Sequence, residues 1–255
     1  MKIGLTVTTH RSEKLKPNGS HLLNSFFDSF RKCNFNYDYC FYVADNQSEI
    51  PFDYPTDLNI KSYYIEDQSK TGITGAWNLS LYEAYMDGCN ILWNFNDDIE
   101  FTEYTNKFIE GIINYKNKDN AVFGPLTNNG GHKCKNYSKA PSKGYTILKT
   151  KPNIWDDNML NGFSFGFTRK VYEKYRYKEN QFFPIKHKLN HGDGKWGGQE
   201  GYFAIKIADG LQLVLVNECW IYHEKFKSYV KVRNEYEQGT EIGIARSNYE
   251  KTGKI

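Results

Sequence analysis

The chain has 255 residues, of which 39% are hydrophobic and 16% are aromatic, and its formal net charge is +3. This composition supports a sizeable core and excludes an intrinsically disordered protein. Acidic and basic residues are interspersed along the chain, which gives no electrostatic reason to expect a nucleic-acid partner.

The cysteines and the apolar runs predict the compartment. The five cysteines form no CxxC pair, so neither a zinc knuckle nor a disulfide framework is indicated, and free thiols in a reducing compartment are expected. No apolar run approaches the roughly 18 residues that span a bilayer, and the first run is too short for a signal peptide. We therefore expect a cytoplasmic protein without a transmembrane segment.

The first 125 residues alternate short apolar strands with amphipathic helices. Strands are predicted at 3–7, 39–44, 60–65, 90–95 and 121–124. Helices are predicted from a cap at Ser20, from a cap at Thr74, and around 108–113, each with apolar residues at helical spacing. This alternation predicts an α/β fold with a mostly parallel central sheet that is flanked by helices.

The second half is less regular. Residues 126–157 are polar and rich in Gly, Asn and Lys, which is typical of a functional or mobile connection. Strands are predicted at 159–167 and 211–216, the latter running on to 223, and helices at 169–175 and 199–208. A further helix is predicted around 230–238.

Polar residues follow three predicted parallel strands at their carboxyl ends, at 8–11, 45–47 and 96–98. Ligands bind at this edge of such sheets, so the three loops predict a crevice of the kind that a nucleotide occupies. Asp97 and Asp98 are costly beside a buried strand unless a divalent cation pairs with them. The alternative is a solvated turn with two exposed acids.

These features, in this order, resemble the glycosyltransferases of the GT-A fold, in particular the inverting family-two type. Asn96-Asp97-Asp98 resembles the family's DxD-type motif, with Asn in place of the first acid. The resemblance implies that Asp98 binds the metal and that Asn96 and Asp97 face the donor. It also implies a nucleotide pocket built from these residues: Thr8, Arg11, Asp45, Lys70 and Asn78.

Two later segments extend the resemblance. Trp196-Gly-Gly-Gln-Glu200 resembles the segment that ends in the catalytic base of inverting members, which gives Glu200 that role, although Gln199 replaces the usual acid. His223 matches the histidine that completes the metal site. Trp155, Phe163 and Trp196 could stack on an acceptor sugar or simply pack.

The resemblance implies a single domain, 1–255, with a nucleotide-sugar-binding half (1–125), an acceptor and catalytic half (126–225) and an extension (226–255). We expect a hexosyltransferase that uses Mn²⁺ or Mg²⁺ and transfers a sugar from a nucleotide-diphosphate donor, UDP rather than GDP, to a glycan or other hydroxyl acceptor, with inversion favoured. The alternatives are an inactive sugar- or nucleotide-binding module and a nucleotidyltransferase. Sugar, linkage and oligomeric state are left open.

Overall fold

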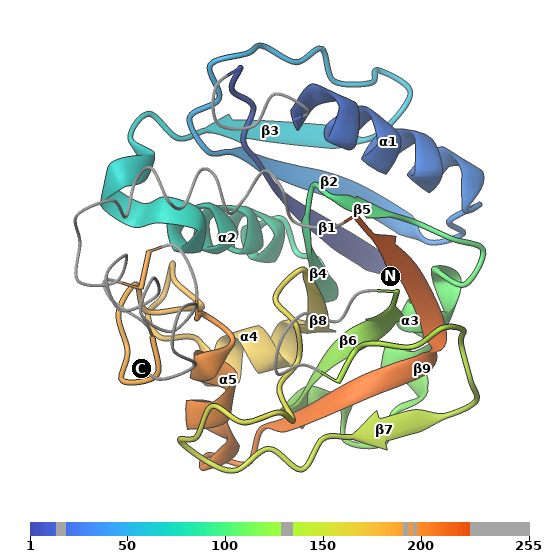
Figure 1. The fold of residues 1–255 in the computed structure, drawn as a ribbon, viewed down its shortest axis with the longest axis vertical. Coiled ribbons are helices and arrows are strands. Elements are labelled where there is room, and N and C mark those ends of the chain that lie inside the picture. The colour runs from blue at the N-terminus through green and yellow to red at the C-terminus, as the bar shows by residue number, and fades with distance from the viewer. Residues whose placement is uncertain (14–18, 129–134, 191–193, 196–197, 225–255) are drawn as a thin grey trace, which may run out of the picture.

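The computed structural model describes residues 1–13, 19–128, 135–190, 194–195 and 198–224. Strands β1 to β9 form one mixed sheet in the order β3-β2-β1-β4-β8-β6-β9-β5, and β7 pairs with β9. The sheet extends from β3 at the top of Figure 1 to β7 at the bottom. The strands are Lys2–Thr9, Asp38–Asp45, Ile60–Tyr64, Ile91–Asn96, Ile99–Glu100, Ala121–Thr127, Tyr145–Ile147, Ser164–Thr168 and Gln212–His223.

The first half of the sheet is parallel, as predicted. β1 pairs with β2 and with β4, and β2 pairs with β3, all in parallel. The central strands are buried almost throughout, because helices cover both faces of the sheet. Continuous apolar runs such as 91–95 are what a strand buried on both faces requires.

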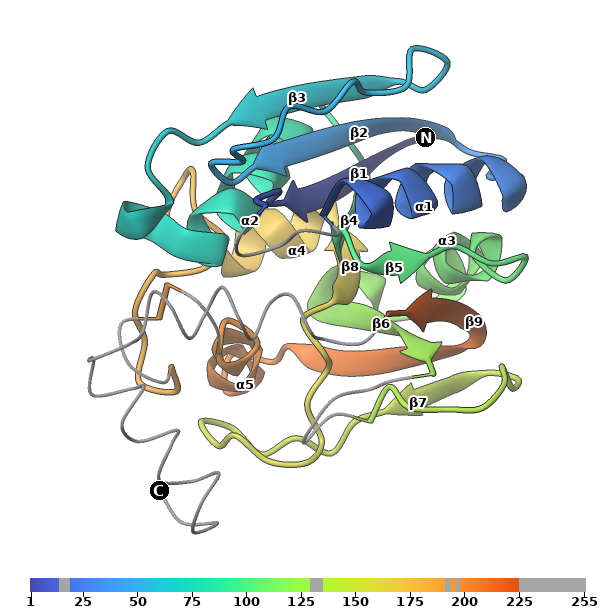
Figure 2. The same ribbon diagram turned by 45° about the horizontal axis from the view of Figure 1, so that its top comes forward.

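The helices divide into two layers. α1 (Gly19–Lys32) and α3 (Asn106–Asn114) contribute Phe26 and Ile109 to the apolar core on one face. α2 (Gln68–Met86), α4 (Arg169–Tyr175) and α5 (Gly201–Ile207) contribute Trp77, Tyr172 and Phe203 to the core on the other face. Figures 1 and 2 show this arrangement of helices. A short 3-10 turn at Lys118–Asn120 leads into β6.

Two local features differ from the prediction. α2 is longer than predicted, because Asp67 caps an additional helical segment that begins at Gln68; non-helical Gly72 (φ 57°) separates this segment from the helix that follows it, near the predicted cap at Thr74. β8 lies between β4 and β6 and is antiparallel to both, so the sheet is mixed in its second half. Among the described residues of the polar stretch 126–157 are the end of β6 and the short strand β7.

Some predictions fall outside the described residues, namely Trp196, the helix around 230–238 and the extension 226–255. Within the described ranges, none of the helices combines the length and the apolar character that crossing a membrane requires. Cys33, Cys40, Cys89 and Cys219 are buried free thiols.

Candidate active site

Strand register brings the three predicted polar loops together. Thr9 lies opposite Asp45 across the β1–β2 pair, and Thr8 lies opposite Asn96 across the β1–β4 pair. The backbone N–H of Asn46 donates to the carbonyl of Thr9 at 2.8 Å, which continues the ladder beyond the strands. The carboxyl ends of β1, β2 and β4 therefore lie side by side, as the parallel order predicts.

A buried ion pair fixes the loop after β1. Arg11 is 1% exposed, and its Nη2 lies 2.5 Å from Oδ2 of Asp45. Arg11 Nε also donates to the carbonyl of Ile50 at 3.0 Å, and the guanidinium lies over the ring of Phe52. Since a buried cation is costly without a partner, Asp45 and Arg11 hold each other in place at this edge.

Asp97 is connected to the same pair. Its Oδ2 accepts a hydrogen bond of 2.7 Å from Oγ1 of Thr9. Oγ1 of Thr9 in turn accepts a hydrogen bond of 3.3 Å from Nη1 of Arg11. Asp97 is 3% exposed. This acid of the motif is thus part of an inward-facing network, and Thr9 is a member that the sequence analysis did not select.

Asp98 and His223 lie side by side although 125 residues separate them. Oδ1 of Asp98 lies 3.5 Å from Nε2 of His223. The cause is strand pairing, because Ile99 in β5 is opposite His223 in β9 and the N–H of Glu224 donates to the carbonyl of Asp98 at 2.8 Å. The two adjacent acids therefore have different neighbours, Thr9 for Asp97 and His223 for Asp98.

Phe163 holds the ring of His223, and Asn128 holds its backbone N–H and carbonyl. Phe163 stacks on the imidazole with ring centroids 4.5 Å apart. Asn128 accepts from the N–H of His223 at 2.7 Å and donates to its carbonyl at 3.2 Å. Phe163 is 1% exposed, so it supports the imidazole and is too buried to stack on an acceptor sugar.

A carboxylate oxygen and an imidazole nitrogen at this separation fit a divalent cation as two of its ligands. No group of three or more His, Cys, Asp or Glu side chains that could hold a metal occurs within the described residues. A metal bound by Asp98 and His223 would need its further ligands from the donor diphosphate and water, which is the usual arrangement for Mg²⁺.

Glu200 lies immediately before α5, and its carboxylate packs against the backbone of residue 162. A Cβ on Gly162 would come within 2.1 Å of Oε1 of Glu200. The next residue, Phe163, accepts a hydrogen bond from the N–H of Asn96 at 2.9 Å and stacks on His223. Two consecutive residues, Gly162 and Phe163, thus contact the predicted base and the predicted metal ligand, respectively.

The structure explains why Gln199 replaces an acid. Its side-chain nitrogen donates to the carbonyl of Gly194 at 2.9 Å and to Oγ1 of Thr74, and Thr74 Oγ1 itself donates to the same carbonyl at 2.8 Å. Gln199 is 1% exposed. A buried carbonyl requires a donor, which a carboxylate cannot supply.

Three polar atoms at this edge have no hydrogen-bond partner among the residues that the structure describes. They are Oγ1 of Thr8, Oδ1 of Asn46 and Oδ1 of Asn96. All three are buried atoms at the ends of β1, β2 and β4. Since buried polar atoms are nearly always paired in folded proteins, the cluster indicates a place where a polar ligand would complete the hydrogen bonding.

Two predicted nucleotide contacts have other partners in the structure. The amide of Asn78 is fully engaged with the backbone of Phe183, accepting from its N–H and donating to its carbonyl, both at 2.9 Å. Lys70 has a side chain that is 78% exposed and pairs with Asp67 at 3.1 Å. Neither is brought into the cluster around Asp97 and Asp98.

The sequence matches no protein-family model and no curated protein. Similar solved structures are those of S. aureus TarS. Its fragment 1–349 aligns with 99% of this chain and 73% of its own length, at 14% identity and a TM-score of 0.54. The same fragment in complex with UDP aligns with 100% of this chain and 76% of its own length, at 13% identity and a TM-score of 0.56. The complex with UDP-GlcNAc aligns with 90% of this chain and 61% of its own length, at 14% identity and a TM-score of 0.54.

A likeness at this identity shows the fold. The chain shares with these TarS structures a mixed sheet flanked by helices, and the predicted α/β fold class is confirmed.

Proposed function

We propose that this protein transfers a sugar, of the hexose type, from a UDP-linked donor to a hydroxyl acceptor such as a glycan. The observation that carries the proposal is the set of unpartnered acceptors at the ends of β1, β2 and β4, the last of which leads into Asp98 and its neighbour His223. A nucleotide-sugar supplies hydroxyl donors for such acceptors and a diphosphate for a metal bound at this place. UDP is favoured over GDP because the similar structures of TarS contain UDP and UDP-GlcNAc.

Each group has a part in the proposed reaction. Asp98 and His223 would hold Mn²⁺ or Mg²⁺, and such an ion supplies Lewis-acid stabilisation of the departing diphosphate. Thr8, Asn46 and Asn96 would bind ribose or sugar hydroxyls, while Arg11 and Asp45 fix the loop around the nucleotide. Asp97 orients this loop through Thr9.

Glu200 would accept the proton of the acceptor hydroxyl, as in the inverting family-two enzymes that the chain resembles. Its carboxylate lies against Gly162, next to Phe163 and the imidazole of His223. A base at this position favours inversion, since a single displacement needs a proton acceptor on the side of the incoming hydroxyl. The buried free thiols are consistent with the reducing cytoplasm as the compartment.

The test is donor turnover measured as UDP release from a panel of UDP- and GDP-sugars with and without Mn²⁺. We expect Mn²⁺-dependent release from a UDP-sugar. Asp98→Asn and His223→Ala should each lower it by about a hundredfold or more, the effect of removing a group that stabilises developing charge. Asp38→Asn, at the far end of β2, and His21→Ala, exposed on α1, are the matched controls.

Turnover that survives both changes at full rate would exclude this metal site. Asn96 and Gln199 stand where the motifs of the resembled family have acids. These two differences favour a second candidate function, a binding module that holds a nucleotide-sugar without turning it over. In that case UDP would stabilise the protein against heat although no donor is consumed with any acceptor.

A further inference from the structure

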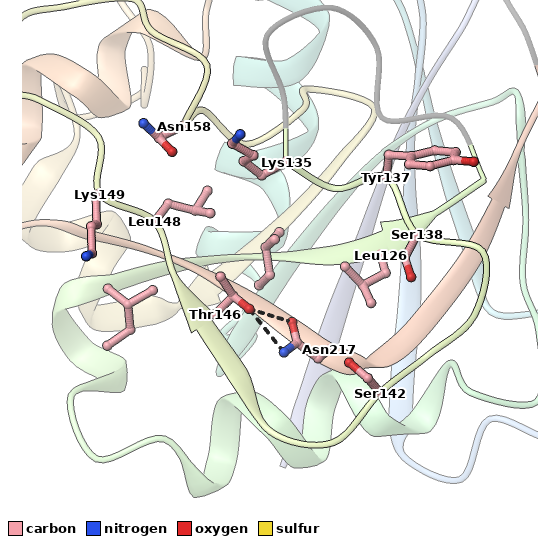
Figure 3. Close-up of a pocket in the computed structure, with 12 residues that line it drawn as sticks. Leu126, Lys135, Tyr137, Ser138, Ser142, Thr146, Leu148, Lys149, Asn158 and Asn217 are labelled. Atoms are coloured by element: carbon pink, nitrogen blue, oxygen red, sulfur yellow. Dashed lines mark hydrogen bonds between the residues drawn. The ribbon is translucent and has the colours of Figure 1, made fainter.

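A hollow of about 440 Å³ opens between β6, β7 and β9, in the half of the molecule that follows the predicted nucleotide edge. Figure 3 shows Lys135, Lys149 and Asn158 along one side of it and Tyr137 and Ser138 along the other. Its size is in the range of pockets that bind small molecules, and it can take one or two sugar units. Nothing in the proposed donor site uses it.

Two lysines, Lys135 and Lys149, line the hollow, and both belong to a lysine-rich stretch of the chain. Residues 135–151 contain five lysines and no acid, in a chain whose net charge is only +3. Of the two lysines that line the hollow, Lys135 and Lys149, neither forms an ion pair with a residue that the structure describes. Two acids close to the lining residues in sequence accept backbone hydrogen bonds, Glu218 from Gly144 and Asp156 from Asn158. The charge is therefore available to an anionic ligand.

The remaining lining suits a carbohydrate. Tyr137 is 58% exposed and Ile147 is 54% exposed, which is unusual for large side chains that border a concave surface. An exposed tyrosine ring offers an apolar face and a hydroxyl, a combination that fits the alternating faces of a sugar. On the floor, Thr146 and Asn217 hold each other at 3.2 and 3.1 Å and present fixed polar groups (Figure 3).

The hollow is joined to the candidate active site by short connections. Leu126 lines it, and Asn128, two residues further, makes the two hydrogen bonds that hold the backbone of His223. Tyr137 forms a β-bridge with Thr127. A chain lying in the hollow would therefore lead toward the residues proposed to bind the metal.

We propose that this hollow binds an acidic carbohydrate chain, with Lys135 and Lys149 facing its carboxylates and Tyr137 stacking on a sugar ring. The inference rests on the proposed function, in which the bound chain is the acceptor. It names the chemical class of that acceptor, which neither the fold nor the donor edge specifies.

The test is direct binding to the full chain, measured by calorimetry without any donor. The probes are hexagalacturonate, the neutral maltohexaose of equal length, and a short single-stranded DNA. We expect hexagalacturonate to bind at least about tenfold more tightly than maltohexaose and DNA. Lys135→Gln/Lys149→Gln should weaken hexagalacturonate binding by about tenfold, as for two screened surface charges, while UDP binding is unchanged. Lys32→Gln/Lys178→Gln removes two exposed lysines elsewhere and should change neither affinity.

The inference would be overturned if hexagalacturonate bound no more tightly than maltohexaose or the DNA. It would also be overturned if the two double lysine variants lost affinity for hexagalacturonate to the same extent. Because no donor is present, these results do not depend on turnover. Binding to the hollow without turnover of any nucleotide-sugar would refute the proposed function and leave the carbohydrate site standing.

Discussion

Replacing Gly162 by alanine is expected to disable catalysis while leaving donor binding intact. The new Cβ would lie 2.1 Å from Oε1 of Glu200 and 2.8 Å from Cη2 of Trp77. Ordinary contact begins near 3.4 Å, so the carboxylate has to move by about 1 Å, because the indole is 2% exposed and packed in the core. A displacement of about 1 Å in a catalytic group costs about a hundredfold in rate.

The same change should lower stability only moderately. Overpacking a filled site costs about 1–3 kcal/mol, and the end of a glutamate side chain can relieve part of the strain. Gly166→Ala in β8 is the matched control, since its Cβ would lie 2.7 Å from Cε1 of Phe108, away from Glu200. We expect a similar loss of unfolding free energy in both variants and a loss of kcat in Gly162→Ala alone.

The assay is kcat for UDP release with a saturating acceptor, beside urea unfolding and the Kd for UDP. If Gly162 acts through Glu200, then Gly162→Ala adds nothing to the kcat of Glu200→Ala in the double variant. The reasoning is refuted if Gly162→Ala retains full kcat, or if its effect multiplies that of Glu200→Ala.

Three other predictions concern stability. Burial lowers the pKa of His187 from 6.5 to about 4. Protonation of this histidine should therefore lower the free energy of unfolding by up to about 2 kcal/mol as the pH falls from 6.5 to 4. In urea titrations, His187→Gln should remove this contribution to the pH dependence of unfolding. A hydrogen bond from Lys2, with others from Lys61 and Tyr42, holds the pKa of Asp87 well below its usual 3.8. Asp87→Asn should lower the free energy of unfolding by about 1 kcal/mol at pH 7, since solvent screens this partly exposed group. In strong acid, where Asp87 becomes protonated, the free energies of unfolding of the two proteins should converge. Gln199→Glu turns a carboxylate toward the carbonyl of Gly194 and should lower the free energy of unfolding by about 2 kcal/mol; an unchanged melting temperature would contradict the hydrogen-bond assignment.

Much of the nucleotide half could be predicted from local pattern alone. The predicted strand 90–95 corresponds to β4 at Ile91–Asn96, and the predicted helix 169–175 is α4. These elements are defined by residues that are close in sequence, since an apolar run or a helical spacing specifies which side chains face the core. The parallel order then placed the polar loops at one edge, where the structure has them.

Contacts between distant residues could not be predicted in that way. The amide of Asn78 bonds the backbone of Phe183, 105 residues away, which no local pattern marks. The backbone N–H of Thr74 donates to the carbonyl of Lys195 at 3.2 Å, across 121 residues of chain, which no local pattern marks either. Phe163 was open to two interpretations until its stacking on His223 was seen.

The sequence by itself determined the class of fold and the edge of the sheet at which polar chemistry gathers, because strand period and chain order specify both. Only the tertiary structure decided which of the two adjacent acids faces His223, since that depends on the pairing of β5 with the end of β9. The tertiary structure also decided that Lys135 and Lys149 line a hollow, because the pairing of β7 with β9 places this polar connection over the sheet.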